Sequence, residues 1–325
     1  MLLPHLLTLT HPTPQAPTPE DIFNSTLGSI FTDSMTNMHG EPEATILYRN
    51  RALGRTLEFR TADVSAEEER TKFAHYLWNA GVLVGELVGG RPGGHPRGRG
   101  EDGDREEEEE ERGTGEGIDG WWIREEEEKW WSVKGERVLE LGAGVGLAGI
   151  VSALSGAKEV TITDYPSPSL LSTLRLNLSA NIPPSHPSAP TTTITPHKWG
   201  HLTTPFALSH AHTYTRILAA DCFWLAHEHT NLAASMAHFL SRDDADARVL
   251  CVAGFHTGRK GLVSFFGDVV KNAGLEVEAI WEMDAGGLRR EWRTRGWGKG
   301  DEVGERGRWV VVGVLRWGVG ESRTE

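Results

Sequence analysis

Cysteine and long apolar runs are both scarce in this chain. Two cysteines among 325 residues, Cys222 and Cys251, cannot build a disulfide framework, so we expect a protein of a reducing compartment, the cytoplasm. No apolar stretch reaches the length that spans a bilayer. The apolar start, residues 1–9, is interrupted by Pro4 and His5 and has no basic segment before it, so we expect no signal peptide.

Positive charge is scarce as well. Lysine and arginine number 33 against 46 acidic residues, which gives a net charge of −13. Residues 91–128 hold 15 of the acids against six arginines, a net of −9, and leave −4 for the rest of the chain. The remainder shows no basic footprint for nucleic acid. We therefore expect no binding to nucleic acid, and we also expect a monomer that does not bind membranes.

The composition of the first 130 residues changes twice. Residues 1–19 hold five prolines and several threonines, which predicts a disordered tail. Residues 20–88 predict an N-terminal extension made of an amphipathic segment at 21–33, a hairpin at 46–59, and a helix from Ala66 to Leu87 with Ser65 as its N-cap. Residues 89–130 predict an acidic, solvated, mobile insert, for which a docking arm for a basic partner is the alternative.

From residue 131 to 318 strand-like and helix-like segments alternate, and a short tail follows at 319–325. Loops are expected at 182–214 and 284–307. The expected strands are 137–141, 160–163, 215–220, 248–254, 275–281 and 308–315, and the expected helices are 147–154, 169–181, 229–239 and 261–272. Such alternation predicts an α/β fold, a Rossmann-like parallel sheet covered on both faces. The last two strands have no helix between them and should pair antiparallel.

The segment Val138–Leu147 (VLELGAGVGL) holds the most informative motif. Its apolar start predicts a buried strand, and Gly142 and Gly144 let the backbone turn tightly and approach a ligand. Helical spacing resumes at Leu147, so a helix N-terminus faces that ligand. Asp164 ends the next expected strand 22 residues after Gly142, where a parallel neighbour places a carboxylate on a ribose diol. A glycine-rich turn without a ligand is the alternative.

The spacing of the glycines separates two kinds of nucleotide. A dinucleotide site has G-x-G-x-x-G, whereas here the spacing is G-x-G-x-G, and Glu140 precedes the first glycine by two. A carboxylate at Glu140 suits a cationic amino-acid group and repels a pyrophosphate. The E-x-G-x-G-x-G form resembles motif I of the class I S-adenosylmethionine methyltransferases.

Six motifs together resemble one family, the fungal nicotinamide N-methyltransferase-like proteins of methyltransferase family 16, which include the elongation factor methyltransferase 7 type. They lie between residues 20 and 318, outside the acidic insert, at 73–81 (FAHYLWNAG), 140–147 (ELGAGVGL), 163–166 (TDYP), 197–200 (HKWG), 217–224 (ILAADCFW) and 252–258 (VAGFHTG). The resemblance implies a seven-strand class I sheet with its last strand antiparallel, and S-adenosyl-L-methionine as cofactor. It also implies a protein substrate, translation elongation factor 1-alpha, methylated on its N-terminal glycine and the adjacent lysine.

The resemblance further implies seven cofactor contacts: Trp78, Gly142, Ala143, Gly144, Asp164, Trp199 and Ala220. We expect Trp78 on the helix that precedes the sheet, and a core tryptophan is the alternative. We expect Trp199 near the adenine, with a plain hydrophobic anchor as the alternative. Ala220 should end its strand at the carboxyl edge of the sheet, where its small side chain admits the cofactor.

Asp221 is the expected group on the substrate side, with Phe223 and Trp224 after it. An acid beside two aromatic rings can hold an ammonium ion, and methyl transfer to an amine is an in-line displacement that mainly needs alignment. A helix cap is the alternative role of Asp221.

Three histidines could pass for bases or metal ligands: His227, His229 and His256. Their spacing lacks a third ligand at any fixed offset, so we expect surface histidines and no metal site. Both cysteines are expected to have no part in the chemistry.

We predict an S-adenosylmethionine-dependent protein N-methyltransferase. The rival enzyme hypothesis is methylation of a small pyridine such as nicotinamide. The rival hypothesis from another class is an inactive methyltransferase fold that serves as a binding module. A protein chain end needs an open groove at Asp221, whereas nicotinamide needs a closed pocket.

Overall fold

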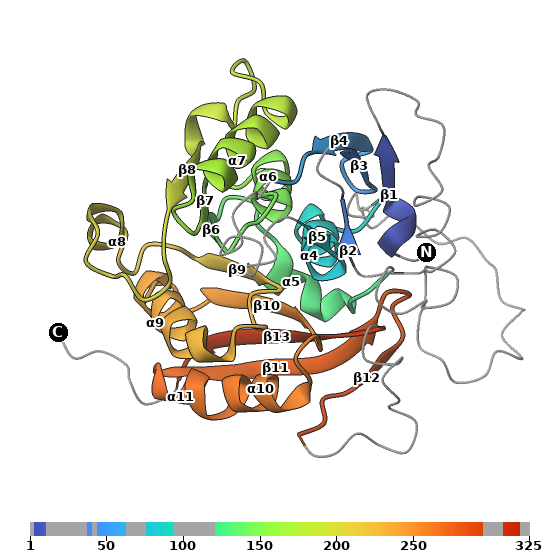
Figure 1. Cartoon of the computed structure of the whole chain (residues 1–325). Coiled ribbons are helices and arrows are strands. Elements are labelled where there is room, and N and C mark those ends of the chain that lie inside the picture. Colours follow the sequence, from blue (N-terminus) through green and yellow to red (C-terminus); the bar gives the residue numbers. More distant parts are fainter. Residues whose placement is uncertain are drawn as a thin grey trace, which may run out of the picture.

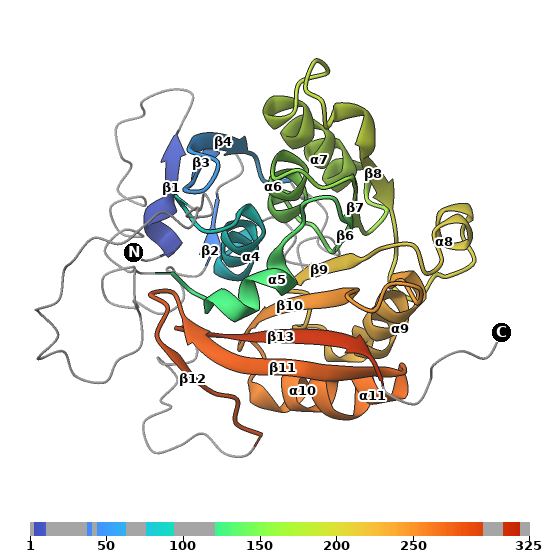
Figure 2. The same ribbon diagram turned by 180° about the vertical axis from the view of Figure 1, so that it is seen from behind.

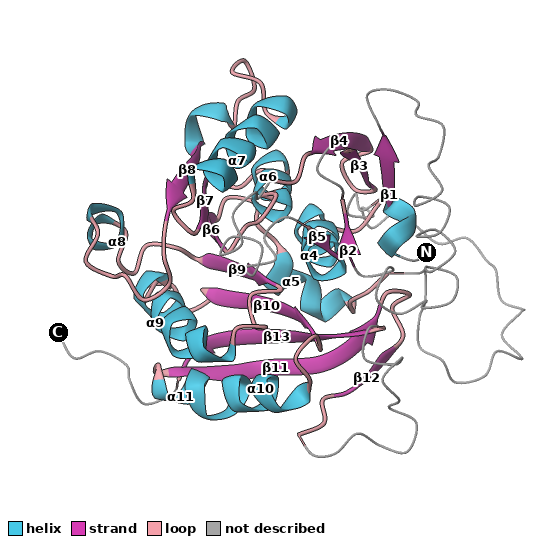
Figure 3. Ribbon diagram, in the orientation of Figure 1, coloured by secondary structure: helices cyan, strands magenta, loops and turns pink. Residues whose placement is uncertain are grey.

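The computed structural model describes residues 3–10, 38–40, 44–62, 76–93, 121–294 and 308–318. An eight-stranded sheet runs through the middle of the molecule, with helices on both faces (Figures 1 and 3). In spatial order its strands are β12 (Arg289–Glu291), β11 (Leu275–Asp284), β13 (Trp309–Trp317), β10 (Arg248–Gly254), β9 (Arg216–Ala220), β6 (Arg137–Leu141), β7 (Glu159–Asp164) and β8 (Thr192–Pro196).

Five neighbouring strands of this sheet, from β10 to β8, are parallel, and β13, β11 and β12 add antiparallel pairs. The α/β prediction and the antiparallel pairing of the last two predicted strands are confirmed. Strands β6 and β9 are neighbours, although β7 and β8 come between them in the chain. The chain therefore changes its direction of travel across the sheet at β6, and ligands of α/β proteins bind beside the carboxyl ends of the strands at such a point.

Two groups of helices cover the two faces, as the views from opposite sides show (Figures 1 and 2). The first group is α4 (Asn79–Gly89), α5 (Glu128–Trp131), α6 (Leu147–Leu154) and α7 (Pro168–Asn181). The second group is α8 (Pro205–Ser209), α9 (His229–Phe239), α10 (Arg259–Ser264) and α11 (Val270–Asn272), with the π-helical turn η6 (Phe265–Val269) between the last two. Short 3-10 turns are η1 (Leu3–Leu6), η3 (Glu125–Glu127), η4 (Ala189–Thr191) and η5 (Ala226–Glu228).

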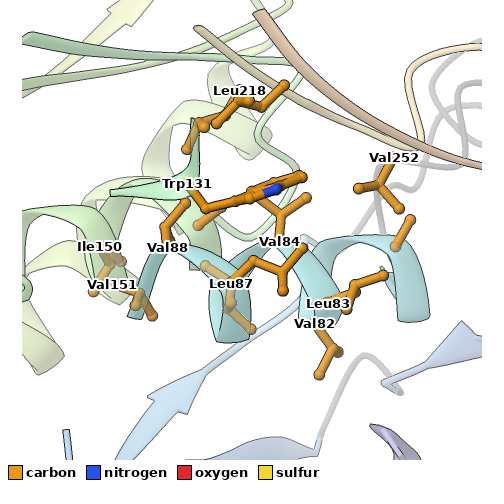
Figure 4. Close-up of a cluster of buried hydrophobic side chains, with 14 of the residues drawn as sticks. Val82, Leu83, Val84, Leu87, Val88, Trp131, Ile150, Val151, Leu218 and Val252 are labelled. Carbon is orange, nitrogen blue, oxygen red and sulfur yellow. The ribbon is translucent and has the colours of Figure 1, made fainter. Parts of the chain in front are cut away.

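Strands β6, β9, β10 and β13 each contribute buried side chains to both hydrophobic cores. Along β10, Leu250 and Val252 join the core under α4 and α6, whereas Val249 and Cys251 join the core under α9 and α10. Successive side chains of a strand point to opposite faces, so a strand buried on both sides is apolar throughout. Figure 4 shows the first core, where residues of α4 pack with Trp131 against the sheet.

A small antiparallel sheet lies beside α4. It joins β1 (Leu7–Thr10), β3 (Thr45–Asn50) and β4 (Arg55–Phe59), and the predicted hairpin at 46–59 is confirmed. The prediction of a disordered tail at 1–19 is wrong for residues 3–10, because Leu3 and Leu6 are buried and β1 pairs with β3. Four of the five prolines that motivated that prediction follow β1, so the composition describes residues 11–19 and not the strand.

The predicted helix Ala66–Leu87 is wrong at its start. Residues 63–75, including the proposed N-cap Ser65, lie outside the described residues, as does the segment 21–33. Leu77–Trp78 form β5, which pairs with β2 (Met38–His39), and α4 begins only at Asn79. The extended backbone of Trp78, with φ −97° and ψ 152°, ends the strand and places this residue at the N-cap of α4.

The acidic insert predicted at 89–130 ends earlier than expected. Trp121, Trp122 and Ile123 are buried in the first core. Glu127, one of the four glutamates assigned to a solvated loop, is buried and pairs with Arg289 at 2.7 Å. Of the segment assigned to the insert, residues 94–120 lie outside the described residues.

Two predicted loops contain structure. Segment 182–214 holds the edge strand β8 and helix α8, and segment 284–307 holds the three-residue strand β12. The helix predicted at 261–272 begins at Arg259 and includes the π-turn η6. Across the described ranges, no helix is both long and apolar enough to cross a bilayer.

Candidate active site

A tight glycine turn follows β6. Gly142 and Gly144 have φ values of 64° and 56°, a region that L side chains rarely adopt. A Cβ atom added to Gly142 would lie 2.7 Å from Sγ of Cys222 and 2.9 Å from Cζ2 of Trp199. The space above this turn is therefore bounded by a thiol and an indole, and a side chain at Gly142 would fill it.

The carboxylate of Asp164 fixes the far side of the turn. Asp164 ends β7, the neighbour of β6, as the sequence predicts. Its Oδ2 accepts a hydrogen bond from the N–H of Gly144 at 2.7 Å, and its Oδ1 accepts one from the N–H of Tyr165 at 2.6 Å. A carboxylate is an acceptor-only group with about four acceptor positions, and such a group suits the hydroxyls of a ribose.

Glu140 lies beneath the turn and points at the first turn of α6. Its Oε2 accepts a hydrogen bond from the N–H of Gly149 at 3.0 Å, and the side chain is buried. Burial raises the pKa of Glu140 from 4.5 to about 8, although the N–H of Gly149 acts to lower it. At neutral pH the group is mostly protonated, so the expected attraction for a cationic amino-acid group is weaker than a fixed carboxylate would give.

A cavity of about 570 Å³ opens above the turn, at the carboxyl ends of the parallel strands. All eight predicted site residues line it: Trp78, Gly142, Ala143, Gly144, Asp164, Trp199, Ala220 and Asp221. They come from β5, β7, β9, the turn after β6 and the loops after β8 and β9. The structure thus brings together residues that are up to 143 positions apart in the chain.

The two tryptophans of the site are half-buried. Trp78 lies at the end of β5 and not on a helix, and its ring packs 4.5 Å from the ring of His256 between centroids. Trp199 packs against the second core and also reaches the glycine turn. Each indole is anchored by a packing contact with the protein, and each also lines the cavity.

Asp221 follows β9 and is one of two non-glycine residues with positive φ in the described part of the chain, at 56°. Its Oδ1 accepts a hydrogen bond from the N–H of Gly254 at 3.0 Å, and its Oδ2 lies 2.7 Å from Nε2 of His256. The alternative role as a helix cap is therefore wrong. Of the two aromatic residues that follow, Trp224 lines the cavity, whereas Phe223 is buried in the second core.

The prediction of surface histidines holds for His227, whose side chain is 73% exposed, and for His256, which is also an exposed residue. His229 is buried, and its Nε2 lies 2.8 Å from the carbonyl oxygen of Phe223. His256 pairs with Asp221, and sequence reasoning missed this partnership. A signal existed, since β9 and β10 were both predicted strands and the carboxyl ends of parallel neighbours meet at one edge.

The cysteines differ in position. Cys222 lines the cavity, and its thiol donates a hydrogen bond to the carbonyl oxygen of Leu141 at 3.1 Å. Burial raises the pKa of both thiols, of Cys222 and of Cys251, above its usual value. Both cysteines are free, and each is in the protonated form that is a poor nucleophile.

Similar proteins were found among curated proteins and among solved structures. The protein N-terminal and lysine N-methyltransferase efm7 of Emericella nidulans is 36% identical over 127 residues, which is 36% of this chain and 48% of that protein. Its counterpart in Schizosaccharomyces pombe is 24% identical over 65% of this chain and 68% of that protein. The mouse protein N-lysine methyltransferase METTL21A is 38% identical over 34% of this chain and 47% of that protein.

The chain spans about half to two thirds of the length of these curated relatives. Among solved structures, magnesium protoporphyrin IX methyltransferase from Synechocystis is similar, with a TM-score of 0.37 and 12% identity over 57% of this chain and 75% of that one. The family described as lysine methyltransferase matches residues 62–271. Because that match covers well over half of the chain and includes the glycine turn, Asp164 and Asp221, this protein belongs to the lysine methyltransferase family.

Proposed function

We propose that this protein is an S-adenosylmethionine-dependent protein N-methyltransferase, and that it methylates the N-terminal glycine and adjacent lysine of translation elongation factor 1-alpha. The observation that carries the proposal is the single cavity that joins the glycine turn and Asp164 with Asp221. The names of the fungal relatives, which describe N-terminal and lysine methylation, support the class of substrate. The choice of elongation factor 1-alpha rests on the resemblance of the motifs.

The turn and its carboxylate fit the proposed cofactor. S-adenosyl-L-methionine, when bound, supplies an electrophilic methyl group on a sulfonium. The open side of Gly142 would accept the ligand where a Cβ would collide with Trp199. Asp164, which ends β7 and lines the cavity, would accept hydrogen bonds from the ribose hydroxyls. Trp78 and Trp199 offer apolar faces for the rest of the ligand.

The polar groups around Asp221 suit a cationic amine. Asp221 and Glu228 both line the cavity, together with the rings of Trp78 and Trp224. Carboxylates attract an ammonium ion, and aromatic faces favour a methylated one. In the transfer, the neutral amine forms an N–C bond as the S–C bond breaks, and the amine proton leaves to solvent. Alignment of the amine is therefore the main task of these residues.

The exposed lining of the cavity favours a chain end over nicotinamide. Tyr165 is 37% exposed and the side chain of His227 is 73% exposed, and both line the cavity. A small pyridine needs a site that closes around it, whereas a protein N-terminus needs an open approach. We place the protein in the cytoplasm as a monomer, a location that the two free cysteines support.

The test uses the full chain with radiolabelled methyl donor and either elongation factor 1-alpha or nicotinamide. We expect label in the protein substrate only. A matched pair of variants links that activity to the cavity: Gly142→Ala, where the new Cβ meets Sγ of Cys222, and Gly267→Ala, where nothing lies within 4 Å. Gly142→Ala should lose methyl transfer, and Gly267→Ala should keep it. Label in nicotinamide alone, or in neither acceptor, would contradict the proposal.

A further inference from the structure

The carboxylate of Asp221 is held by two partners on the same neighbouring segment. Gly254, the last residue of β10, donates its N–H to Oδ1 at 3.0 Å, and His256 places Nε2 2.7 Å from Oδ2. The residue adopts a φ of 56°, a conformation that aspartate tolerates and that the structure must hold in place. The carboxylate therefore has one fixed orientation at the edge of the cavity.

His256 is held as firmly as its partner. Its ring lies 4.5 Å from the ring of Trp78 between centroids, at an angle of 58°. A Cβ at Gly254 would lie 2.5 Å from Nε2 of His256, so the glycine leaves the room that the imidazole occupies. Side-chain exposure is 27% for His256 and 7% for Asp221, so the carboxylate is largely shielded from solvent whereas the imidazole stays partly exposed.

The charges around the pair differ on its two sides. A small recess on the His256 side is lined by Trp78, Asn79, Ala80, Asp221, Gly254, Phe255, Trp309 and Val310. Among those described residues Asp221 is the one charged group, and His39 lies behind Asn79, with Nε2 2.7 Å from its Oδ1. On the other side, the charged or titratable groups of the cavity are Glu140, Asp164, Tyr76, Tyr165, His197, Lys198, Cys222, His227 and Glu228.

The protonation of His256 sets the charge that this pair presents. Burial alone would lower the pKa of His256, but the negative charge of Asp221 and the hydrogen bond to it outweigh burial, so the pKa is raised. With His256 protonated the pair is neutral overall, and the imidazolium repels an incoming cation. With His256 neutral the pair carries one negative charge, and Asp221 attracts that cation.

This inference rests on the proposed function and concerns how the site holds the substrate amine. We propose that His256 is the positioning residue for the substrate amine: it fixes the Asp221 carboxylate and must be neutral for Asp221 to take up a cationic amine. A purely structural histidine would hold Asp221 in place equally well at any pH, so the two roles separate in their pH dependence.

The test measures binding of a cation whose charge does not change with pH. The probe is a short peptide with a trimethylated α-amine, titrated into the protein saturated with S-adenosylhomocysteine by calorimetry between pH 6 and pH 8.5. In the parent protein we expect affinity to rise with pH by roughly fivefold to tenfold, the size of one contact between unit charges that is screened as in bulk water. His256→Gln keeps an amide donor for Asp221 but cannot become charged, so most of that rise should disappear.

Two further variants serve as a second test and as a control. His256→Phe keeps a ring against Trp78 and should flatten the profile in the same way if His256→Gln folds poorly. His201→Gln changes an exposed histidine outside the cavity and should keep the parent profile. A contribution from Glu140, whose pKa is about 8, is common to all four proteins.

The outcomes separate the two proposals. A parent-like rise with pH in folded His256→Gln or His256→Phe overturns the role of His256. So does a parent protein that binds S-adenosylhomocysteine but not the peptide, because Asp221 is then no site for a cation. A parent protein that does not bind S-adenosylhomocysteine contradicts the proposed function itself.

Discussion

Asp164 is the residue whose loss should weaken cofactor binding most directly. Its two oxygens accept hydrogen bonds from the N–H groups of Gly144 and Tyr165, and the carboxylate lines the cavity in which a ribose would donate to it. Hydrogen bonds to charged groups contribute about 1.5–3 kcal/mol, so Asp164→Ala should weaken binding of S-adenosylmethionine roughly tenfold or more in calorimetry. Asp268→Ala, at an exposed position on η6, is the matched control. Unchanged affinity in a folded Asp164→Ala protein would remove Asp164 from the site.

Glu140 makes stability depend on pH in an unusual direction for a carboxyl group. Its pKa is about 8 in the folded protein against an ordinary value of 4.5, so its favourable contribution is complete below about pH 4.5 and is lost as pH rises through 8. Glu140→Gln keeps an acceptor for the N–H of Gly149 and removes the titration. Between pH 5 and pH 9 the parent should therefore lose at least about 1 kcal/mol, or roughly 2 °C in Tm, relative to the variant.

Thermal melts at both pH values check this expectation. Glu126→Gln, an exposed glutamate of η3, is the control and should follow the parent. Parallel melting curves for the parent and Glu140→Gln across the whole range would show that Glu140 is ionised in the folded protein.

At the scale of elements, residues 121–131 belong to the folded body and not to the acidic insert. Trp122 is 3% exposed, and the guanidinium of Arg51 lies 4.3 Å from the centre of its ring. Glu127 pairs with Arg289. Replacing residues 94–120 with a short Gly/Ser linker should leave Tm and methyl transfer unchanged, as composition predicts. Extending the replacement to Glu128 should lower Tm by roughly 5 °C or more, because it removes a buried tryptophan and a buried ion pair.

Differential scanning calorimetry of the two linker variants, side by side, decides this. Equal Tm values would show that residues 121–128 do not stabilise the core. A loss of methyl transfer with unchanged Tm in the shorter replacement would instead show that the insert recruits substrate.

Elements with strong periodicity were predictable from the sequence. The structure begins and ends β6, α9 and β10 at the predicted residues, because β6 and β10 are short, almost continuously buried runs and the buried residues of α9 recur at helical spacing. Strand β8 was missed since it lies at the edge of the sheet, and its sequence TTITP offers little apolar signal. The helical spacing of Leu77 predicts a helix at Trp78. In the structure, pairing with β2 extends the backbone of Leu77 and Trp78 instead.

Some features of the candidate site were likewise predictable from the sequence, and others were not. The glycine turn and Asp164 follow from local spacing within one β-α-β unit, which the sequence contains in full. The pairing of Asp221 with His256 depends on the register of β9 against β10, where Ala220 lies opposite Val252. Hydrophobic patterns predict that such strands exist, but they do not fix which side chains meet beyond the ends of the strands.

At the scale of the whole molecule, the order of methylation follows from amine chemistry under the proposed function. Only a neutral amine attacks the methyl group, and reference pKa values are about 7.7–8.0 for an α-amine and about 10.4 for lysine. Near pH 7.4 roughly a fifth to a third of the α-amine is neutral, against about one lysine in a thousand. Asp221 lends lysine no help here, because a nearby carboxylate raises the pKa of an amine.

We therefore expect the N-terminal glycine of elongation factor 1-alpha to be methylated before the adjacent lysine. Mass spectrometry of the substrate over a time course shows the order, and a substrate with a blocked α-amine isolates the lysine reaction. Lysine methylation that precedes α-amine methylation would show that the site lowers the pKa of the lysine.

The position of β13 has a consequence for how the protein is made. It lies between β10 and β11 in the sheet, yet it follows both of them in the chain. A ribosome therefore completes two strands before it produces the one that joins them. Until then both strands expose unpaired backbone edges and apolar faces, a combination that favours aggregation. We therefore expect a product truncated before Trp309 to aggregate and to be found in inclusion bodies.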